Sequence, residues 1–320
     1  TPKCSKRRSL SRTRMPDITV IVPTHNRAPL LRQHLSALAS QTFPRAATEW
    51  IVVCDGCRDD SATVARDAGA DRVIELDGRG AAAARNAGLE AASAQLVAFL
   101  DDDIIPAPWW LWALVDDAGA NPGRTLHMGY CPYSPKAIRS HLDRRNAGWY
   151  EAKLQPLQDP NHEWQFTDFF GGNFAADRKA LTELGGFDSR FALFEDAELA
   201  LRALKAGWQI RFVKAARAEH HAHREVAEYG RQAFRSGQID VLFAAVHPEA
   251  APSLRIGMRR PAIKRQIGNV WRALTSHNTL GVRAVARGAQ IGERFSPRPV
   301  LDLLYALLWD GEYWRGVAAA

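Results

Sequence analysis

Residues 95–103 read QLVAFLDDD, a short apolar run that ends in three successive aspartates. Five consecutive apolar residues predict a strand buried on both faces, as in parallel sheets that are covered by helices. Similar runs occur at residues 17–24, 49–55 and 71–77, and each is followed by a segment with apolar residues at helical spacing. This alternation predicts an α/β fold with a Rossmann-like, mostly parallel sheet flanked by helices.

Polar residues stand where several of the predicted strands end. In open sheets of this kind, ligands bind at the carboxyl ends of the strands. Pro23 and Thr24, Asp55 and the aspartates at 101–103 occupy three of these ends. Adjacent carboxylates repel one another, and closely spaced oxygen ligands suit Mg²⁺ or Mn²⁺, which also hold diphosphates. One site at this edge is therefore predicted, although a solvated acidic turn would also explain residues 101–103.

Two helix starts carry further candidate groups. Glu195 and Asp196 open a predicted helix, where a carboxylate either caps free N–H groups or acts as a general base at a cleft. Residues 78–83 open another helix and weakly match a dinucleotide fingerprint, while close helix–sheet packing would explain their alanines equally well. Neither pattern alone decides between a structural and a chemical role.

Histidines and tryptophans also leave alternatives open. His220, His221 and His223 follow a predicted strand, and they form either part of a metal site or a surface cluster. Residues two apart on an extended chain face the same side, so His221 and His223 would share a ligand. Trp109 either stacks on a sugar ring or packs as part of a buried helix face.

Composition narrows the function classes. The net charge of +7 predicts an anionic partner, but no basic block is interleaved with aromatic residues, which argues against nucleic-acid binding. Four cysteines are too few for a disulfide framework, so we expect a reducing, cytoplasmic compartment. Cys54 and Cys57 have C-x-x-C spacing without a second ligand pair, and we interpret them as strand and turn residues. No apolar run is long enough to span a membrane.

The motifs, in this order, resemble those of the family 2 glycosyltransferases, which have the GT-A fold. The resemblance spans residues 18–246, and Cys57 stands where serine is usual in the family. Each motif is weak or moderate alone, whereas five in the correct order are specific. The matching segments are VIVPTHNR (20–27), VVCDGCRDDS (52–61), GRGAAAARNAGLEAA (78–92), FLDDDIIPAP (99–108), and GGNFAADRKALTELGGFD with FEDAELALRALKAG (171–188 and 194–207).

The resemblance implies a role for each matching residue. Asp55 would accept a hydrogen bond from the base, and Arg85 would contact the diphosphate or order the loop beside it. Asp196 would be the general base, and Asp103 with His221 would bind Mn²⁺ or Mg²⁺. The residues implied in nucleotide-sugar binding are Pro23, Thr24, Arg27, Asp55, Arg85, Asp101 and Asp102. Those implied near the donor sugar and acceptor are Gly172, Asn173, Glu195 and Trp109.

The implied activity is inverting transfer of a sugar from a nucleotide-sugar, most simply a UDP-sugar, to an acceptor hydroxyl. A carbohydrate, a lipid-linked sugar or a natural product would each serve as acceptor. Two alternatives come from other classes. A nicotinamide-dependent oxidoreductase would use residues 78–83, but it leaves residues 101–103 without a role. A glycosyltransferase-like binding protein would have lost catalysis.

The domain boundaries follow from these segments. We expect a disordered basic tail at 1–15 and a catalytic domain at 16–246. Its nucleotide-binding half runs to about residue 131, and its acceptor half begins at about 132 with an irregular, lid-like stretch. Residues 247–320 form a C-terminal helical extension rich in arginine and tryptophan. Peripheral contact with an anionic membrane, docking on the catalytic domain and a homodimer contact all remain open for it.

Overall fold

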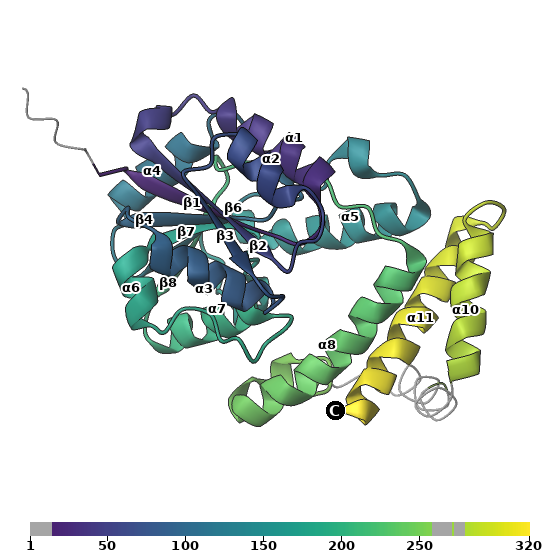
Figure 1. Cartoon of the computed structure of the whole chain (residues 1–320). Coiled ribbons are helices and arrows are strands. Elements are labelled where there is room, and N and C mark those ends of the chain that lie inside the picture. The colour runs from purple at the N-terminus through teal and green to yellow at the C-terminus, as the bar shows by residue number, and fades with distance from the viewer. Residues whose placement is uncertain (1–14, 258–270, 272–278) are drawn as a thin grey trace, which may run out of the picture.

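A computed structural model describes residues 15–257, 271 and 279–320. Within these residues a seven-stranded sheet has the order β3-β2-β1-β4-β7-β6-β8, and Figure 1 shows it between helices on both sides. Only β7 runs antiparallel to its neighbours, so the mostly parallel sheet predicted from the sequence is confirmed. The strands are β1 Ile18–Thr24, β2 Thr48–Asp55, β3 Arg72–Leu76, β4 Leu96–Leu100, β6 Thr125–Gly129, β7 Asn173–Asp177 and β8 Gln209–Val213.

Alternating side chains along the central strands bury both faces of the sheet. In β4, Val97 and Phe99 point into one core cluster, while Ala98 and Leu100 point into the other. Helices α3, α6 and α7 supply the first cluster, and α1, α2 and α4 supply the second. The helices of these layers are α1 Ala28–Ala39, α2 Ser61–Asp67, α3 Ala81–Ala91, α4 Trp110–Ala120, α6 Arg178–Glu183 and α7 Glu195–Lys205.

A short antiparallel ribbon lies at the carboxyl edge of the sheet. β5 (Ile104–Pro106) follows the three aspartates directly and pairs with β9 (Ala218–His220). Ile104 lies opposite His220 in this register. The ribbon therefore brings the histidine segment to the acidic end of β4, although the two are more than 100 residues apart.

The irregular stretch after residue 132 contains a long helix. α5 (His141–Leu154) begins with a capping box, in which the Ser140 hydroxyl accepts the Asp143 backbone N–H. The Asp143 carboxylate accepts the N–H of Ser140 in return. The stretch expected to be irregular and lid-like from its scattered Pro, Trp and His residues thus contains a regular helix. The pattern misleads because the polar face of α5 is wide and its apolar positions are few.

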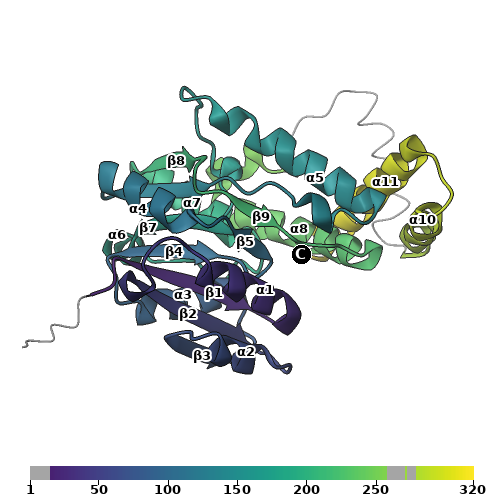
Figure 2. The ribbon, with the colours of Figure 1, turned by 90° about the horizontal axis from the view of Figure 1, so that it is seen from above.

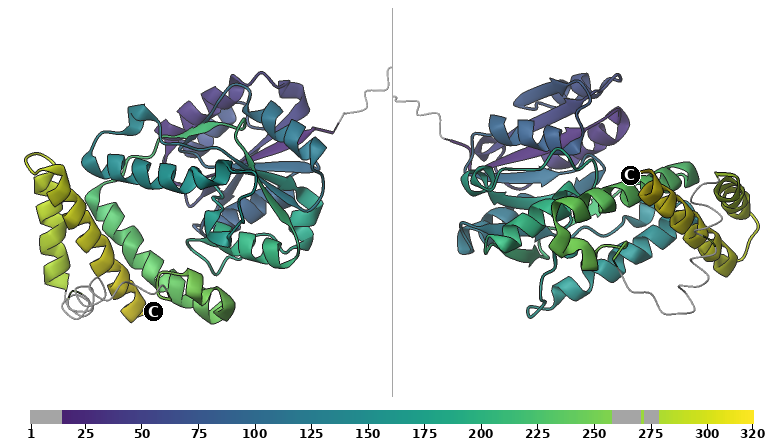
Figure 3. Two further views of the ribbon diagram at one scale, coloured as in Figure 1. Left: turned by 180° about the vertical axis from the view of Figure 1, so that it is seen from behind. Right: turned by 90° about the horizontal axis from the view of Figure 1, so that it is seen from below.

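Three helices form a unit beside the sheet domain: α8 (Val226–Val246), α10 (Thr279–Gly292) and α11 (Arg298–Ala319). Figures 1 and 3 show α8 and α11 side by side, with α10 against α11. Glycine permits this close packing, because a Cβ at Gly237 would lie 2.0 Å from the Tyr313 carbonyl oxygen. The expected helical extension is present, and α8 packs with it although the sequence places α8 in the catalytic domain. The division at residue 246 stays a prediction.

Figure 2 shows α5 over the carboxyl edge of the sheet, between the sheet domain and α11. Among the described residues, no helix has the length and apolar character needed to cross a membrane. The predicted basic tail at 1–15 lies almost wholly outside the described residues, as does the arginine-rich part of the extension at 258–270.

Candidate active site

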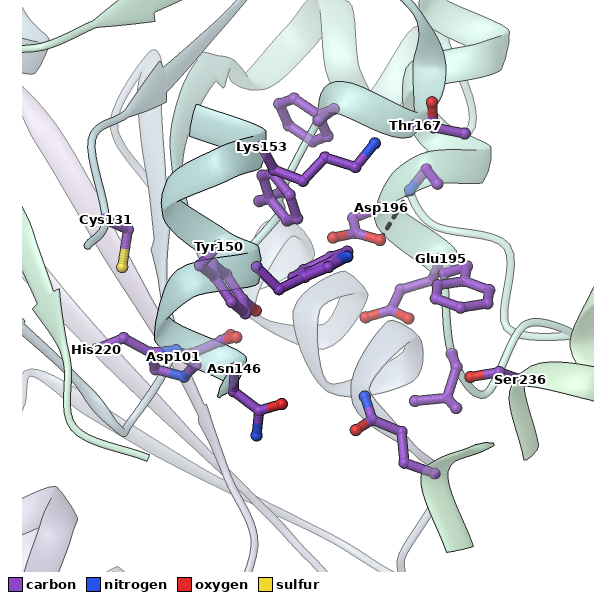
Figure 4. A pocket seen from close by; sticks show the side chains of 18 of the residues that line it. Asp101, Cys131, Asn146, Tyr150, Lys153, Thr167, Glu195, Asp196, His220 and Ser236 are labelled. Carbon is purple, nitrogen blue, oxygen red and sulfur yellow. Dashed lines mark hydrogen bonds between the residues drawn. The ribbon is translucent and has the colours of Figure 1, made fainter. Parts of the chain in front are cut away.

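A cavity of about 850 Å³ lies at the carboxyl edge of the sheet. Its floor comes from the ends of β4, β6 and β7, and its walls come from α5, the start of α7, α8 and α11. Figure 4 shows Asp101, Glu195, Asp196 and His220 around it. The sheet edge predicted to carry a single site therefore opens into a space large enough for a substrate.

The three aspartates at the end of β4 have different partners. Asp102 accepts the Thr24 hydroxyl at 2.6 Å and Arg27 Nη1 at 3.0 Å. Arg27 Nη1 also donates to Asp103 Oδ2 at 2.8 Å. Burial raises the pKa of the Asp102 carboxyl to about 6 despite Arg27. At Asp103, burial acts the same way but is outweighed by His220 and Arg27, which hold its pKa well below the usual range. Two anions are thus kept together by one arginine.

Arg85 is a buried bridge between two of the motifs. Its Nη2 donates to Asp101 Oδ1 at 2.7 Å, and its Nη1 pairs with Glu195. Burial disfavours its charge, yet Asp101 and Glu195 more than compensate and raise its pKa further. Of its two expected roles, the geometry favours ordering the site, since both terminal nitrogens already bind carboxylates. Glu195 therefore serves as the ion-pair partner of Arg85, and it also lines the cavity.

Asp196 lies in the first turn of α7, and two backbone N–H groups hold its carboxylate. Its Oδ2 accepts the Gly171 N–H at 2.7 Å, and its Oδ1 accepts the Ala197 N–H at 2.8 Å. A Cβ at residue 171 would lie 2.6 Å from the Asp196 Cβ, so glycine is required there. Burial, and then the neighbouring Glu195, raise the pKa of Asp196 to about 6. The group lines the cavity and is close to the range in which a carboxylate is an effective base.

Asp55 ties β2 to the start of α3. Its two oxygens accept the backbone N–H groups of Arg79 and Gly80, each at 2.7 Å. Gly78 and Gly80 both have positive φ, which lets this loop turn toward the carboxylate. Each oxygen keeps one further lone pair for a base N–H. The loop that mimics a dinucleotide fingerprint is therefore occupied by a side chain of the protein.

His220, and not His221, turns its side chain toward the acidic cluster. His220 Nε2 lies 3.4 Å from Asp103 Oδ1, and its buried Nδ1 has no hydrogen-bond partner among the described residues. His221 instead donates its backbone N–H to the Asp103 carbonyl and places its ring near Glu219. Alternation along β9 explains the difference. The resemblance implied His221 as the metal ligand, whereas the geometry favours His220; the choice between them stays a prediction.

A carboxylate and an imidazole at this distance suit Mg²⁺ or Mn²⁺ that is also bound by a diphosphate. An imidazole binds a given ion through one ring nitrogen, so in this arrangement His220 offers a single nitrogen ligand, Nε2, which faces Asp103. Within the described residues no three His, Cys, Asp or Glu side chains converge as a complete metal cage. A two-ligand site completed by the substrate is the arrangement that the residues allow.

The remaining predicted residues lie in different parts of the structure. Gly172 and Asn173 line the cavity, and Asn173 also bridges Trp110 Nε1 and the Ala216 carbonyl. Pro23 lies at the end of β1 beside Thr24, on the nucleotide side. Trp109 does not fit its expected place near the sugar: it is absent from the cavity lining and lies exposed before α4. Its neighbour Trp110 is the buried one.

Sequence reasoning missed the cavity wall formed by α5. Asn146, Trp149, Tyr150 and Lys153 all line the cavity from this helix. The one signal for it was the capping box at Ser140, an S-x-x-D pattern ahead of the helix.

Comparison with known proteins gives the family. Residues 19–185 match the model of glycosyl transferase family 2, and residues 156–224 match one described as the N-terminal domain of galactosyltransferase. Glycosyltransferase AglE of Haloferax volcanii is 27% identical over 248 residues, which cover 71% of this chain and 74% of the relative. The pre-mycofactocin glycosyltransferase of Mycobacterium tuberculosis is 28% identical over 253 residues, 75% of this chain and 50% of that protein.

A solved mannosyltransferase from Pyrobaculum calidifontis, in complex with GDP-mannose and Mn²⁺, has a TM-score of 0.63 and 23% identity. The similarity covers 93% of this chain and 86% of that one, which confirms the predicted GT-A fold. Several curated relatives are longer, and the match spans about half of their length. The family model alone covers more than half of the 320 residues. The chain therefore belongs to glycosyl transferase family 2.

Proposed function

We propose that the protein transfers a sugar from a nucleotide-sugar, with UDP-sugars as the first candidates, to an acceptor hydroxyl with inversion. The observation that carries the proposal is the position of Asp196. It lines the cavity, its pKa is raised to about 6, and two backbone N–H groups fix its orientation. A carboxylate in this state is ionised at neutral pH and basic enough to accept a proton.

The reaction would proceed as a single displacement. The acceptor oxygen forms a bond to the anomeric carbon, the bond between that carbon and the diphosphate oxygen breaks, and Asp196 takes the hydroxyl proton. Because one displacement occurs, the configuration inverts and no second carboxylate nucleophile is needed. Glu195 is unsuited to that second role, since Arg85 holds it in a buried ion pair.

Asp103 and His220 would hold Mn²⁺ or Mg²⁺ when the donor binds, and the cation would neutralise charge on the diphosphate. The protein's own contribution at this edge comes from Arg27. The Arg27 side chain is about half exposed while it bridges Asp102 and Asp103. It would therefore lie beside the diphosphate when a donor binds. Thr24 fixes Asp102, and Asp55 fixes the loop at 78–80 against which the base would lie.

The family assignment removes the nicotinamide-dependent alternative. The structure also gives this alternative no phosphate site at residues 78–83. The backbone N–H groups of residues 79 and 80 bind Asp55 and do not face an open site. The inactive binding protein remains to be tested against the transferase.

The described part of the extension supports contact with an anionic membrane surface. Phe295 is 82% exposed and Ile291 is 58% exposed at the turn between α10 and α11. Arg294 and Arg298 are exposed beside them, and within the described residues neither has an acidic partner. Apolar side chains flanked by free arginines match an anionic lipid surface, where the apolar groups insert and the arginines meet headgroups. A homodimer contact would use the apolar groups but leave the arginines unmatched.

The decisive experiment for the activity is Asp196→Asn. Loss of a general base lowers the rate by roughly 10²–10⁴, while UDP binding with Mn²⁺, measured by calorimetry, should stay within a factor of two or so of the wild type because the residue lies on the acceptor side. Donor consumption is followed as release of UDP or GDP from a panel of UDP- and GDP-sugars. Wild-type protein that binds a donor but releases no nucleotide with any acceptor would favour the inactive binding protein.

A further inference from the structure

The charges lining the cavity are unevenly paired. Arg85 is neutralised by Asp101 and Glu195, Arg145 lies 3.2 Å from Asp302, and Arg255 lies 2.9 Å from Asp310. Two further cations line the cavity without such a partner.

Lys153 has no hydrogen bond or ion pair to any described residue, and the guanidinium of Arg224 donates only to the neutral Gln232 side chain within the same part of the chain. Figure 4 shows the Lys153 amine pointing into the cavity from α5, on the side of Asp196. Lys153 is partly buried. A partly buried ammonium without a partner is stabilised electrostatically when an anion binds beside it.

Aromatic side chains give the same cavity an apolar wall. Trp149 is half exposed at the surface of the cavity and packs edge-on against Tyr150 and Phe170. Trp309, from α11, lines the opposite part. The cavity therefore combines aromatic surface, two unpaired cations and the proposed base.

We propose that the acceptor is an anionic amphipathic molecule, whose phosphate or carboxylate lies against Lys153 while its hydroxyl faces Asp196, and that Arg224 adds positive charge elsewhere in the same cavity. The proposal rests on the transferase function above and adds the chemical class of the acceptor. Because Arg85 neutralises Glu195, the charge that would repel an anionic acceptor is that of Asp196, and Lys153 and Arg224 offset it. A neutral acceptor would leave both cations without a partner in the closed complex, which selects against it.

The anionic group has two sources, a soluble phosphate ester or a lipid-linked phosphate. Binding of three probes separates them: phenyl phosphate, n-decyl phosphate, and neutral n-decyl β-D-glucoside. Each is titrated in a calorimeter with UDP and Mn²⁺ saturating, so that the diphosphate position is occupied and the probe reports on the cavity. Tight binding of decyl phosphate alone indicates a lipid-linked acceptor, and equal binding of both phosphates indicates a soluble one.

We expect Lys153→Met to weaken phosphate binding about tenfold or more, since a hydrogen bond between charged groups contributes at least that much. Lys153→Arg keeps the charge and should retain most of the affinity, and Arg224→Gln should weaken binding in the same direction as Lys153→Met. Lys179→Met is the matched control, because Lys179 lies on the surface of α6 with 83% of its side chain exposed.

Equal affinity for the decyl glucoside and decyl phosphate, or unchanged phosphate binding in Lys153→Met, would overturn the proposal. Absence of binding by either phosphate ester to wild-type protein would overturn it as well. Parallel samples of the same protein without added UDP show whether UDP binds and whether a nucleotide-sugar is hydrolysed. Failure of those two measurements would count against the transferase function itself, so the two failures are distinguishable.

Discussion

Replacing Arg85 by methionine separates its two suggested roles, ordering the site and binding diphosphate. In the structure Arg85 is buried and bonded at both ends, to Asp101 and to Glu195. Methionine keeps much of the side-chain volume but removes the charge. The change therefore leaves a nearly buried Glu195 carboxylate without its counter-ion, while the Asp101 side chain, about a third exposed, can turn to solvent.

The expected cost follows from this asymmetry. Removing one partner of a buried ion pair typically destabilises a protein by about 3–5 kcal/mol. One kcal/mol shifts the melting temperature of a domain of this size by roughly 2–4 °C, so a loss of about 6–20 °C is expected. The double variant Arg85→Met/Glu195→Gln should recover part of it, because the stranded charge is then absent.

Urea unfolding followed by circular dichroism measures the free energy of unfolding of Arg85→Met, Glu195→Gln and the double variant. Calorimetry measures UDP affinity for each folded protein. The structural role predicts a large stability loss, partial rescue in the double variant, and UDP affinity within a few-fold of wild type. A stability change under about 1 kcal/mol, together with UDP affinity lowered tenfold or more, would refute the reasoning and assign Arg85 to the diphosphate.

Three further predictions test other parts of the proposal. His220→Ala should raise the Mn²⁺ concentration needed for half-maximal UDP release, whereas His221→Ala should change it little; the reverse order would restore the ligand chosen from sequence spacing. Because Asp196 acts only when ionised, kcat/KM should rise with pH through about 6 and level off above it; a flat profile from pH 5 to 7 contradicts the base assignment. Phe295→Glu should abolish co-sedimentation with vesicles containing anionic lipid, while Trp112→Glu, a similar change at another exposed aromatic residue, should not; equal binding by both variants would exclude this turn as the contact.

Much of the fold could be predicted because its signals are local. Apolar runs such as Leu96–Leu100 indicate buried strands, and the polar residues at their ends mark the ligand edge. The antiparallel insertion of β7 and the β5–β9 ribbon could not be predicted, since both depend on pairing between segments far apart in sequence. The preference for His220 over His221 has the same origin, because the ribbon register decides which histidine faces Asp103.

The candidate site likewise has features that local sequence could predict and features that depend on distant contacts. Asp55, Asp103 and Asp196 stand in short motifs, and the resemblance of these motifs to the family implies a nucleotide-sugar site. The partners that set their chemistry were not predictable. The raised pKa of Asp196 depends first on burial, which no local pattern encodes. Arg85 was expected to contact the diphosphate or to order the loop beside it, and its partner Glu195, 110 residues away, could not be predicted from local sequence.

The acceptor side of the enzyme lies largely beyond the family resemblance. The two family models end at residues 185 and 224, whereas Tyr229, Trp309 and Tyr313 line the cavity from α8 and α11. Close contact between α8 and α11 at Gly237 and Gly316 fixes that wall. The two family models therefore cover the donor side, whereas helices beyond their ends line part of the cavity. For this reason the charges of the cavity, and not the relatives' acceptors, are the better guide to the substrate.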